Sequence, residues 1–187
     1  MNWKNTPRRY GSLAISLHWL MFLLMAGLYA CIELRVLYPK GSDPREALKM
    51  WHFMLGLSVG LLVWLRLTVR LSNVKPMIEP AIAAWQKYLA SAVHWSLYLL
   101  MIGMPLAGWF MLSAAGKPIP FFGLELPPLI GKNPELAKTI KEVHATVGTV
   151  GYYVIGLHVL AALYHHYLAK DDALVRMLPF KKYTHRT

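Results

Sequence analysis

Four long apolar stretches constrain this chain more than any other feature of its sequence. They contain no lysine and one arginine, Arg66 near an end, and they cover residues 13–32, 53–69, 89–112 and 147–168. Each is close to the ~20 residues that a helix needs to cross a hydrocarbon core of ~30 Å. The segments also lack the polar face that a soluble helix needs. The sequence therefore predicts an all-α fold, an integral-membrane four-helix bundle forming a single domain over residues 1–187.

Composition and cysteine content exclude several other classes of protein. Hydrophobic residues make up 56% of the 187 residues and charged residues 16%, whereas a typical soluble domain has about 25% charged residues. A disordered chain is excluded and an ordinary soluble enzyme disfavoured. The single cysteine, Cys31, excludes an intramolecular disulfide, a four-cysteine metal site and covalent haem attachment through a C-x-x-C-H motif. We expect the lipid bilayer as a partner, and no nucleic acid.

The distribution of positive charge predicts the orientation in the membrane. The N-terminal tail, the second loop and the C-terminal tail hold 12 lysines and arginines, among them Lys181, Lys182 and Arg186, and the first and third loops hold 8. By the positive-inside rule, both termini are then cytoplasmic. The first apolar stretch exceeds the ~7–15 residues of a signal-peptide core, so we expect it to be retained. The third loop is rich in proline, and we expect a helix from Pro134 into the fourth stretch.

Histidines are concentrated in the apolar stretches. Of the eight in the chain, five lie in or at the ends of these stretches: His18, His52, His94, His144 and His158. Ionisable residues inside a membrane are costly and mark functional sites by default. For any single histidine, a hydrogen bond to a neighbouring helix is the alternative. His165 and His166 lie at the cytoplasmic end of the last stretch, and we expect His185 to be solvated in the tail.

The depths of these histidines pair them at two levels. His144 and His158 are 14 residues apart, which places them on one helix face and ~21 Å apart along the axis. By depth, His52 meets His144 near the outer boundary, and His18 meets His158 near the inner one. This spacing suits two stacked haems, and two imidazoles that close both axial positions of an iron make an electron carrier. A zinc site would need four ligands in one place, which two separate levels do not provide.

Small and basic residues accompany the histidines. Glycines follow each outer histidine on its helix face, Gly56 and Gly60 after His52 and Gly148 and Gly151 after His144. They would let a flat macrocycle approach the backbone, and small-residue helix packing explains them equally well. Arg66 lies below His52 on the same face, where it could pair with a propionate of the inner haem or serve as a positive flank. Arg35 is a weaker candidate for the same part at the outer level.

Four segments carry a resemblance to a known family. They are residues 15–20 (ISLHWL), 155–158 (IGLH), 163–167 (LYHHY) and 170–177 (KDDALVRM). Through these segments the sequence resembles the bacterial cytochrome b561 family. The resemblance extends over nearly the whole chain and is strongest to the small stand-alone di-haem members of the family. The resemblance implies a multi-pass protein of the bacterial inner membrane with two non-covalent haem b groups. It also implies the iron ligands, His18 with His158 and His52 with His144.

The resemblance further implies electron transfer between the periplasmic face and the quinone pool. For the stand-alone branch, superoxide is oxidised to dioxygen and ubiquinone is reduced at a cytoplasmic site near His165, Ala84 and Tyr88. Independently, His165 follows His158 by seven residues, so it lies ~20° from its face and ~10 Å nearer the cytoplasm. Contact with lipid headgroups is the alternative for His165. By depth His94 could replace His18 as a ligand, but the family pairing argues against this, so we place it near the haem or the quinone.

A superoxide donor is an anion that positive side chains could steer to the outer haem. Arg45 and Lys49 precede His52, and Lys141 precedes His144 by three residues. The two outer loops hold eight basic and six acidic residues, so any steering must come from local clustering, and ordinary solvated charges are the alternative. Two other functions stay open. The chain could anchor a separate dehydrogenase or hydrogenase as a partner, or it could be a proton-coupled transporter without haem.

Overall fold

The computed structural model describes residues 2–179. The tail residues Lys181, Lys182, His185 and Arg186 lie outside the described residues. The elements in chain order are α1 (Ser12–Leu34), the 3-10 turn η1 (Arg35–Leu37), α2 (Asp43–Leu71), α3 (Ala84–Ala114), β1 (Pro120–Phe121), β2 (Leu124–Glu125), α4 (Pro134–Tyr167) and the 3-10 turn η2 (Val175–Met177). Four helices are long and apolar enough to cross a membrane. The predicted all-α membrane bundle is thereby confirmed.

The helices extend beyond the apolar stretches because local signals set their ends. In α2, Asp43 and Glu46 occupy the first turn and Arg70 the last, which complements the helix dipole at both ends. In α4, the Asn133 side chain accepts a hydrogen bond of 3.1 Å from the Leu136 amide, and proline follows at the first helical position, where its missing amide hydrogen costs nothing. Hydropathy therefore locates the membrane crossing, whereas the first-turn acidic residues of α2 and the Asn133 cap of α4 mark where these two helices begin.

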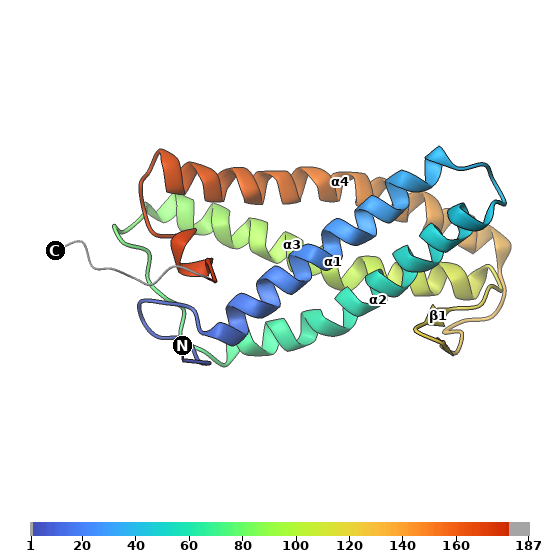
Figure 1. The fold of residues 1–187 in the computed structure, drawn as a ribbon, viewed down its shortest axis with the longest axis horizontal. Coiled ribbons are helices and arrows are strands. Elements are labelled where there is room, and N and C mark those ends of the chain that lie inside the picture. The colour runs from blue at the N-terminus through green and yellow to red at the C-terminus, as the bar shows by residue number, and fades with distance from the viewer. Residues whose placement is uncertain (1, 180–187) are drawn as a thin grey trace.

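The four helices form an up-and-down bundle (Figure 1). The start of α1 and the turn η2 lie at the same end of the bundle as the loop between α2 and α3, and we call this the terminal end. The loop between α1 and α2 and the β1–β2 hairpin lie at the opposite end, the hairpin end. Since α3 and α4 run in opposite directions, the start of α3 and the end of α4 share the terminal end.

The interior and the outer faces of the bundle are both apolar. A buried cluster of Met21, Val59, Val63 and Tyr98 joins α1, α2 and α3. Outward-facing leucines on the helices are also well exposed, with Leu99 at 71%. Large exposed apolar surfaces mark contact with a partner or a membrane, and here they surround helices of membrane-spanning length.

Two of the singled-out glycines are explained by helix packing. A Cβ added at Gly60 would lie 2.8 Å from the Pro105 Cβ of α3, and one added at Gly151 would collide with the Tyr29 hydroxyl of α1. A Cβ at Gly56 would meet no protein atom within 4 Å. Close helix packing therefore explains Gly60 and Gly151, whereas Gly56 leaves open space near His52, as the approach of a macrocycle would need.

The hairpin is an addition to the predicted all-α chain. Pro120 pairs with Glu125 and Phe121 with Leu124 in an antiparallel ladder. The turn residues Phe122 and Gly123 both have positive φ, 46° and 85°, as a two-residue hairpin turn requires. No alternating pattern predicts these strands, because each is two residues long and the turn places a phenylalanine where glycine or asparagine is usual.

Candidate functional site

Three histidines meet inside the bundle toward the terminal end. His18 comes from α1, His94 from α3 and His158 from α4, and all three are half-buried. The ring centroids of His18 and His158 are 6.3 Å apart, and those of His94 and His158 are 5.3 Å apart. The structure thus brings together the predicted inner pair and places the third histidine beside it.

The outer pair meets nearer the hairpin end. The ring centroids of His52 in α2 and His144 in α4 are 6.4 Å apart. His52 Nδ1 lies 2.8 Å from the Leu28 carbonyl oxygen. Since a carbonyl can only accept, Nδ1 carries the hydrogen and Nε2 of neutral His52 keeps its lone pair. His144 Nδ1 is buried and has no hydrogen-bond partner among residues 2–179.

The spacing within each pair fits two imidazoles that share one metal ion. A zinc–imidazole bond measures about 2 Å, and with a ring centroid about 1 Å beyond the nitrogen, two coaxial rings sharing an ion of that size lie about 6 Å apart. The pairs at 6.3 and 6.4 Å match this value. The 5.3 Å separation of His94 and His158 is shorter than such an arrangement requires.

Arg66 of α2 joins the inner cluster. Its Nη2 lies 3.0 Å from His18 Nδ1, and its Nη1 is buried without a hydrogen-bond partner among the described residues. An arginine can only donate, so in this arrangement the proton of neutral His18 is on Nε2. A metal ligand must instead present an unprotonated nitrogen. Arg66 therefore has to release His18 when His18 binds a metal, and its unpartnered donor suits an anionic acceptor nearby.

The basic residues at the hairpin end differ in how free their charges are. Arg45 donates from Nη1 to the carbonyl oxygens of Arg35 and Tyr38, at 3.1 and 2.8 Å, so it closes the loop between α1 and α2. Lys49 pairs with Glu46 at 2.6 Å, and Lys141 is exposed. The Nε atoms of Arg35 and Arg45 are buried without a hydrogen-bond partner in the described chain.

The terminal end holds the residues predicted for quinone. His165 lies in the last turn of α4, Ala84 is the first residue of α3, and the Tyr88 side chain is 78% exposed. His165 Nδ1 contacts a carboxylate oxygen of Asp171. Sequence reasoning missed Asp171 as a functional side chain, because the contact depends on a reversal of the chain after α4. The acidic pair after the last apolar stretch was the available signal.

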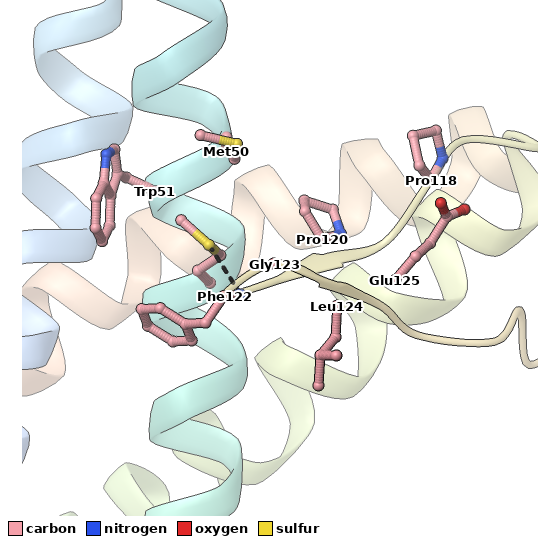
Figure 2. Close-up of a pocket in the computed structure, with 9 residues that line it drawn as sticks. Met50, Trp51, Pro118, Pro120, Phe122, Gly123, Leu124 and Glu125 are labelled. Atoms are coloured by element: carbon pink, nitrogen blue, oxygen red, sulfur yellow. Dashed lines mark hydrogen bonds between the residues drawn. The ribbon is translucent and has the colours of Figure 1, made fainter.

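Sequence reasoning also missed a cavity under the hairpin (Figure 2). Its volume is about 490 Å³, and its lining includes Met50, Trp51 and Met54 of α2 facing Phe122, Leu124 and Glu125 of the hairpin. The Phe122 amide donates to the Met54 sulfur at 3.3 Å. The lining is apolar apart from the Glu125 carboxylate, so this cavity does not suit an anion.

A single-site metal centre does not arise within the described residues. Among positions 2–179, no group of three or more histidine, cysteine, aspartate or glutamate side chains is arranged to hold a metal ion. What the bundle offers is two separate histidine pairs. Two axial imidazoles leave the equatorial positions of an iron to a macrocycle. Fold and site together define a membrane cytochrome of the b type, whose haem is held without covalent attachment.

Comparisons with known proteins give the same class. The family model for prokaryotic cytochrome b561 matches residues 9–180. Cytochrome b561 homolog 1 of Escherichia coli (strain K12) is 37% identical over 93% of this chain and 99% of its own length. The probable superoxide oxidase CybB of Yersinia pestis is 38% identical over 94% of this chain and 98% of its own length. Cytochrome b561 homolog 2 of Escherichia coli (strain K12) is 27% identical over 95% of each chain.

The chain belongs to the prokaryotic cytochrome b561 family. It is a bacterial membrane protein of electron transfer, an oxidoreductase that binds haem b. Because the proteins of this family are haem-binding electron carriers, the alternative of a transporter without haem is wrong.

Proposed function

We propose that this protein is a single-domain di-haem b oxidoreductase of the bacterial inner membrane that oxidises superoxide and reduces ubiquinone. The observation that carries the proposal is that two separate pairs of histidines each have the ring spacing expected when two imidazoles bind one metal ion. His144 and His158, one from each pair, lie on the same helix, ~21 Å apart along its axis. One level then serves the donor at one membrane face, and the other serves the acceptor at the opposite face.

His18 with His158 would hold one haem, and His52 with His144 the other. When bound, each haem would supply reversible one-electron transfer. His52 is prepared for this role, since the Leu28 carbonyl holds the hydrogen on Nδ1. A hydrogen bond from the ring nitrogen that does not bind the metal orients a ligating imidazole and raises its basicity.

Arg66 and Arg35 would bind haem propionates at the inner and outer levels. The support for Arg66 is its buried, unpartnered Nη1 and its position against His18. A propionate would draw the guanidinium away from His18 Nδ1 and so free that nitrogen to carry the hydrogen. For Arg35 the support is a buried Nε without a partner in the described chain.

The terminal end would face the cytoplasm, following the excess of lysine and arginine in the tails and the second loop. The hairpin end would then meet superoxide in the periplasm. The name of the Yersinia pestis relative, a probable superoxide oxidase, supports superoxide as the donor. Arg45, Lys49 and Lys141 would steer the anion, with Lys141 the most available of the three because Arg45 and Lys49 are already engaged.

The quinone site would lie at the terminal end around His165, with Ala84 and Tyr88 at the start of α3 and His94 between the inner pair and the quinone. Two superoxide ions give up two electrons and leave as dioxygen. Ubiquinone takes up these two electrons and two protons and leaves as ubiquinol. His165 would donate a hydrogen bond to a ubiquinone carbonyl.

The test is stopped-flow absorbance of the purified protein in lipid nanodiscs. Pulses of superoxide should reduce both haems, and a soluble ubiquinone analogue should then re-oxidise them. His165→Ala should keep both haems and the superoxide step but slow re-oxidation, and unchanged re-oxidation would remove His165 from the site. If superoxide does not reduce the haems, the donor is a different molecule, and a membrane anchor for a separate dehydrogenase becomes the leading function.

A further inference from the structure

A histidine and a buried carboxylate form a pair at the terminal end. His165 Nδ1 contacts Asp171 Oδ2, and the side chains are 16% and 1% exposed. The other carboxylate oxygen, Oδ1, accepts from the Ala173 amide at 2.9 Å. Burying a carboxylate is costly unless it is paired and hydrogen-bonded, and Asp171 meets both conditions through these two contacts.

The segment that carries Asp171 is fixed to distant parts of the chain. The Arg176 Nη1 donates to the carbonyl oxygens of Pro76 and Met77, both at 2.8 Å. The Trp19 indole donates to the Met177 carbonyl at 2.8 Å. Because these contacts tie the segment to the loop between α2 and α3 and to α1, the carboxylate is held in place before any ligand arrives.

The contact with Asp171 determines which nitrogen of His165 faces outward. An ionised carboxylate only accepts, so Nδ1 carries a hydrogen and donates it. Nε2 lies on the side of the ring away from this contact, and the His165 side chain as a whole is 16% exposed. A histidine held in this way offers Nε2 alone for contact with a ligand.

We propose that Asp171 is a positioning residue for the reduction of ubiquinone: it fixes the His165 ring with a hydrogen on Nδ1, so that Nε2 hands protons to the quinone oxygen. The inference rests on the proposed quinone site at His165. It assigns the delivery of protons to His165 and Asp171, because the two haem-binding histidine pairs deliver only electrons.

The reduction of one ubiquinone takes two electrons and two protons. Two superoxide ions supply the two electrons and become dioxygen. At His165 the Nε2–H bond breaks and an O–H bond forms on the quinone, while the Nδ1–H bond to Asp171 stays. Before this transfer the ring carries both protons and a positive charge, which the Asp171 carboxylate balances in direct contact. Water at the terminal end returns a proton to Nε2, and a second transfer completes ubiquinol.

The direct test is Asp171→Asn. The Ala173 amide can only donate, so the new amide oxygen stays with it and the new NH2 group turns to His165 Nδ1, which moves the ring hydrogen to Nε2. Both haems should remain. The kcat for ubiquinone reduction should fall about 10- to 100-fold, the usual cost of losing an orienting partner behind a functional histidine, with little change in KM. Asp171→Glu, which keeps the carboxylate, should recover part of the rate.

A structural readout accompanies the kinetics. Nitrogen-15 NMR of histidine-labelled, reduced protein, with His165→Gln to identify the signals, should show a protonated Nδ1 in the wild type and an unprotonated Nδ1 in Asp171→Asn. This measurement on the wild type stands even if the variant does not fold, and a hydrogen on Nε2 alone would overturn the inference. Glu79→Gln is the matched control, since it removes the same charge from an exposed neighbouring side chain and should change neither readout.

The outcomes separate the two proposals. If His165→Gln leaves ubiquinone reduction unchanged, the quinone site itself is elsewhere. If His165→Gln slows the reaction while Asp171→Asn keeps the wild-type kcat and nitrogen signals, the quinone site stands and the role of Asp171 is refuted.

Discussion

Replacing His144 with alanine should remove one haem and leave the other. The proposed outer haem depends on His52 and His144, whose rings are 6.4 Å apart on two helices. Without His144, the iron keeps one protein ligand in an apolar site, and the haem is poorly held. The inner pair should be unaffected because His158 lies ~21 Å away along α4, and sites more than about 10 Å apart behave independently.

The expected magnitude is a fall in haem content from two per chain to one. His18→Ala should give the same fall through the inner haem. His94→Ala is the matched control at the inner level, since its 5.3 Å distance to His158 is too short for a shared iron; it should keep two haems. The three variants together separate ligands from a neighbouring histidine that is equally buried in the bundle.

The assay is haem per chain from the pyridine haemochrome spectrum, together with the low-spin signals of the oxidised protein in electron paramagnetic resonance. His144→Ala should retain one low-spin signal and re-oxidation by quinone, and should lose rapid reduction by superoxide. A His144→Ala protein with two low-spin haems would refute the pairing. Loss of the inner haem in His94→Ala but not in His18→Ala would replace His18 with His94 as the ligand.

Three further predictions follow from particular contacts. Glu46→Gln, which frees the charge of Lys49, should raise the rate of haem reduction by superoxide and Lys49→Gln should lower it, with both effects fading at 1 M salt, where the screening length is about 3 Å. Gly60→Ala should lower the free energy of unfolding by about 1–3 kcal/mol through overpacking against Pro105, seen as a lower thermal midpoint with an unchanged haem spectrum. Gly56→Ala should instead lower the content of the outer haem, because the added methyl group fills open space near His52. Both histidine pairs have ring planes far from parallel, 71° and 75°. If the rings keep these angles when haem binds, two d orbitals of each iron stay nearly equal in energy, and both oxidised haems should give strongly anisotropic signals in electron paramagnetic resonance. An ordinary rhombic signal would show that the ring planes turn on haem binding.

Local rules were enough to predict the bundle and the two levels of its histidines, whereas the choice of His18 over His94 at the inner level came from the family resemblance. Apolar length gives the spans, and helical rise and turn give the depth and face of His144 and His158. Because both quantities are repeated in every turn of a regular helix, small errors at helix ends do not change them. This is why the two levels could be predicted although α2 and α4 begin ten and thirteen residues before the apolar stretches.

The terminal and hairpin ends could not be predicted in the same way. The Asp171 carboxylate reaches His165 through a reversal of the chain after α4, and the segment that follows is held by the hydrogen bond from Arg176 to Pro76, 100 residues earlier in the chain. Such long-range contacts leave no periodic signal in the sequence. The hairpin is set by a two-residue turn. The ion pair between Lys49 and Glu46 depends on side-chain rotamers, which the sequence does not show. Two of the side chains predicted to steer an anion, Arg45 and Lys49, are therefore already engaged in the structure.

The two levels are built differently, and the difference suits a direction of electron flow. All four helices place a side chain at the inner level, namely His18, Arg66, His94 and His158, and the C-terminal segment adds Asp171 near the same end. The outer pair comes from α2 and α4, with the Leu28 carbonyl of α1 holding His52, and it lies toward the hairpin end, where Lys141 is exposed. A one-electron donor as small as superoxide needs only access and a favourable charge, whereas quinone reduction needs electrons and protons delivered to one molecule in a fixed position. The more elaborate level is therefore at the end where the chemistry is more demanding, and this agrees with a donor at the hairpin end and ubiquinone at the terminal end.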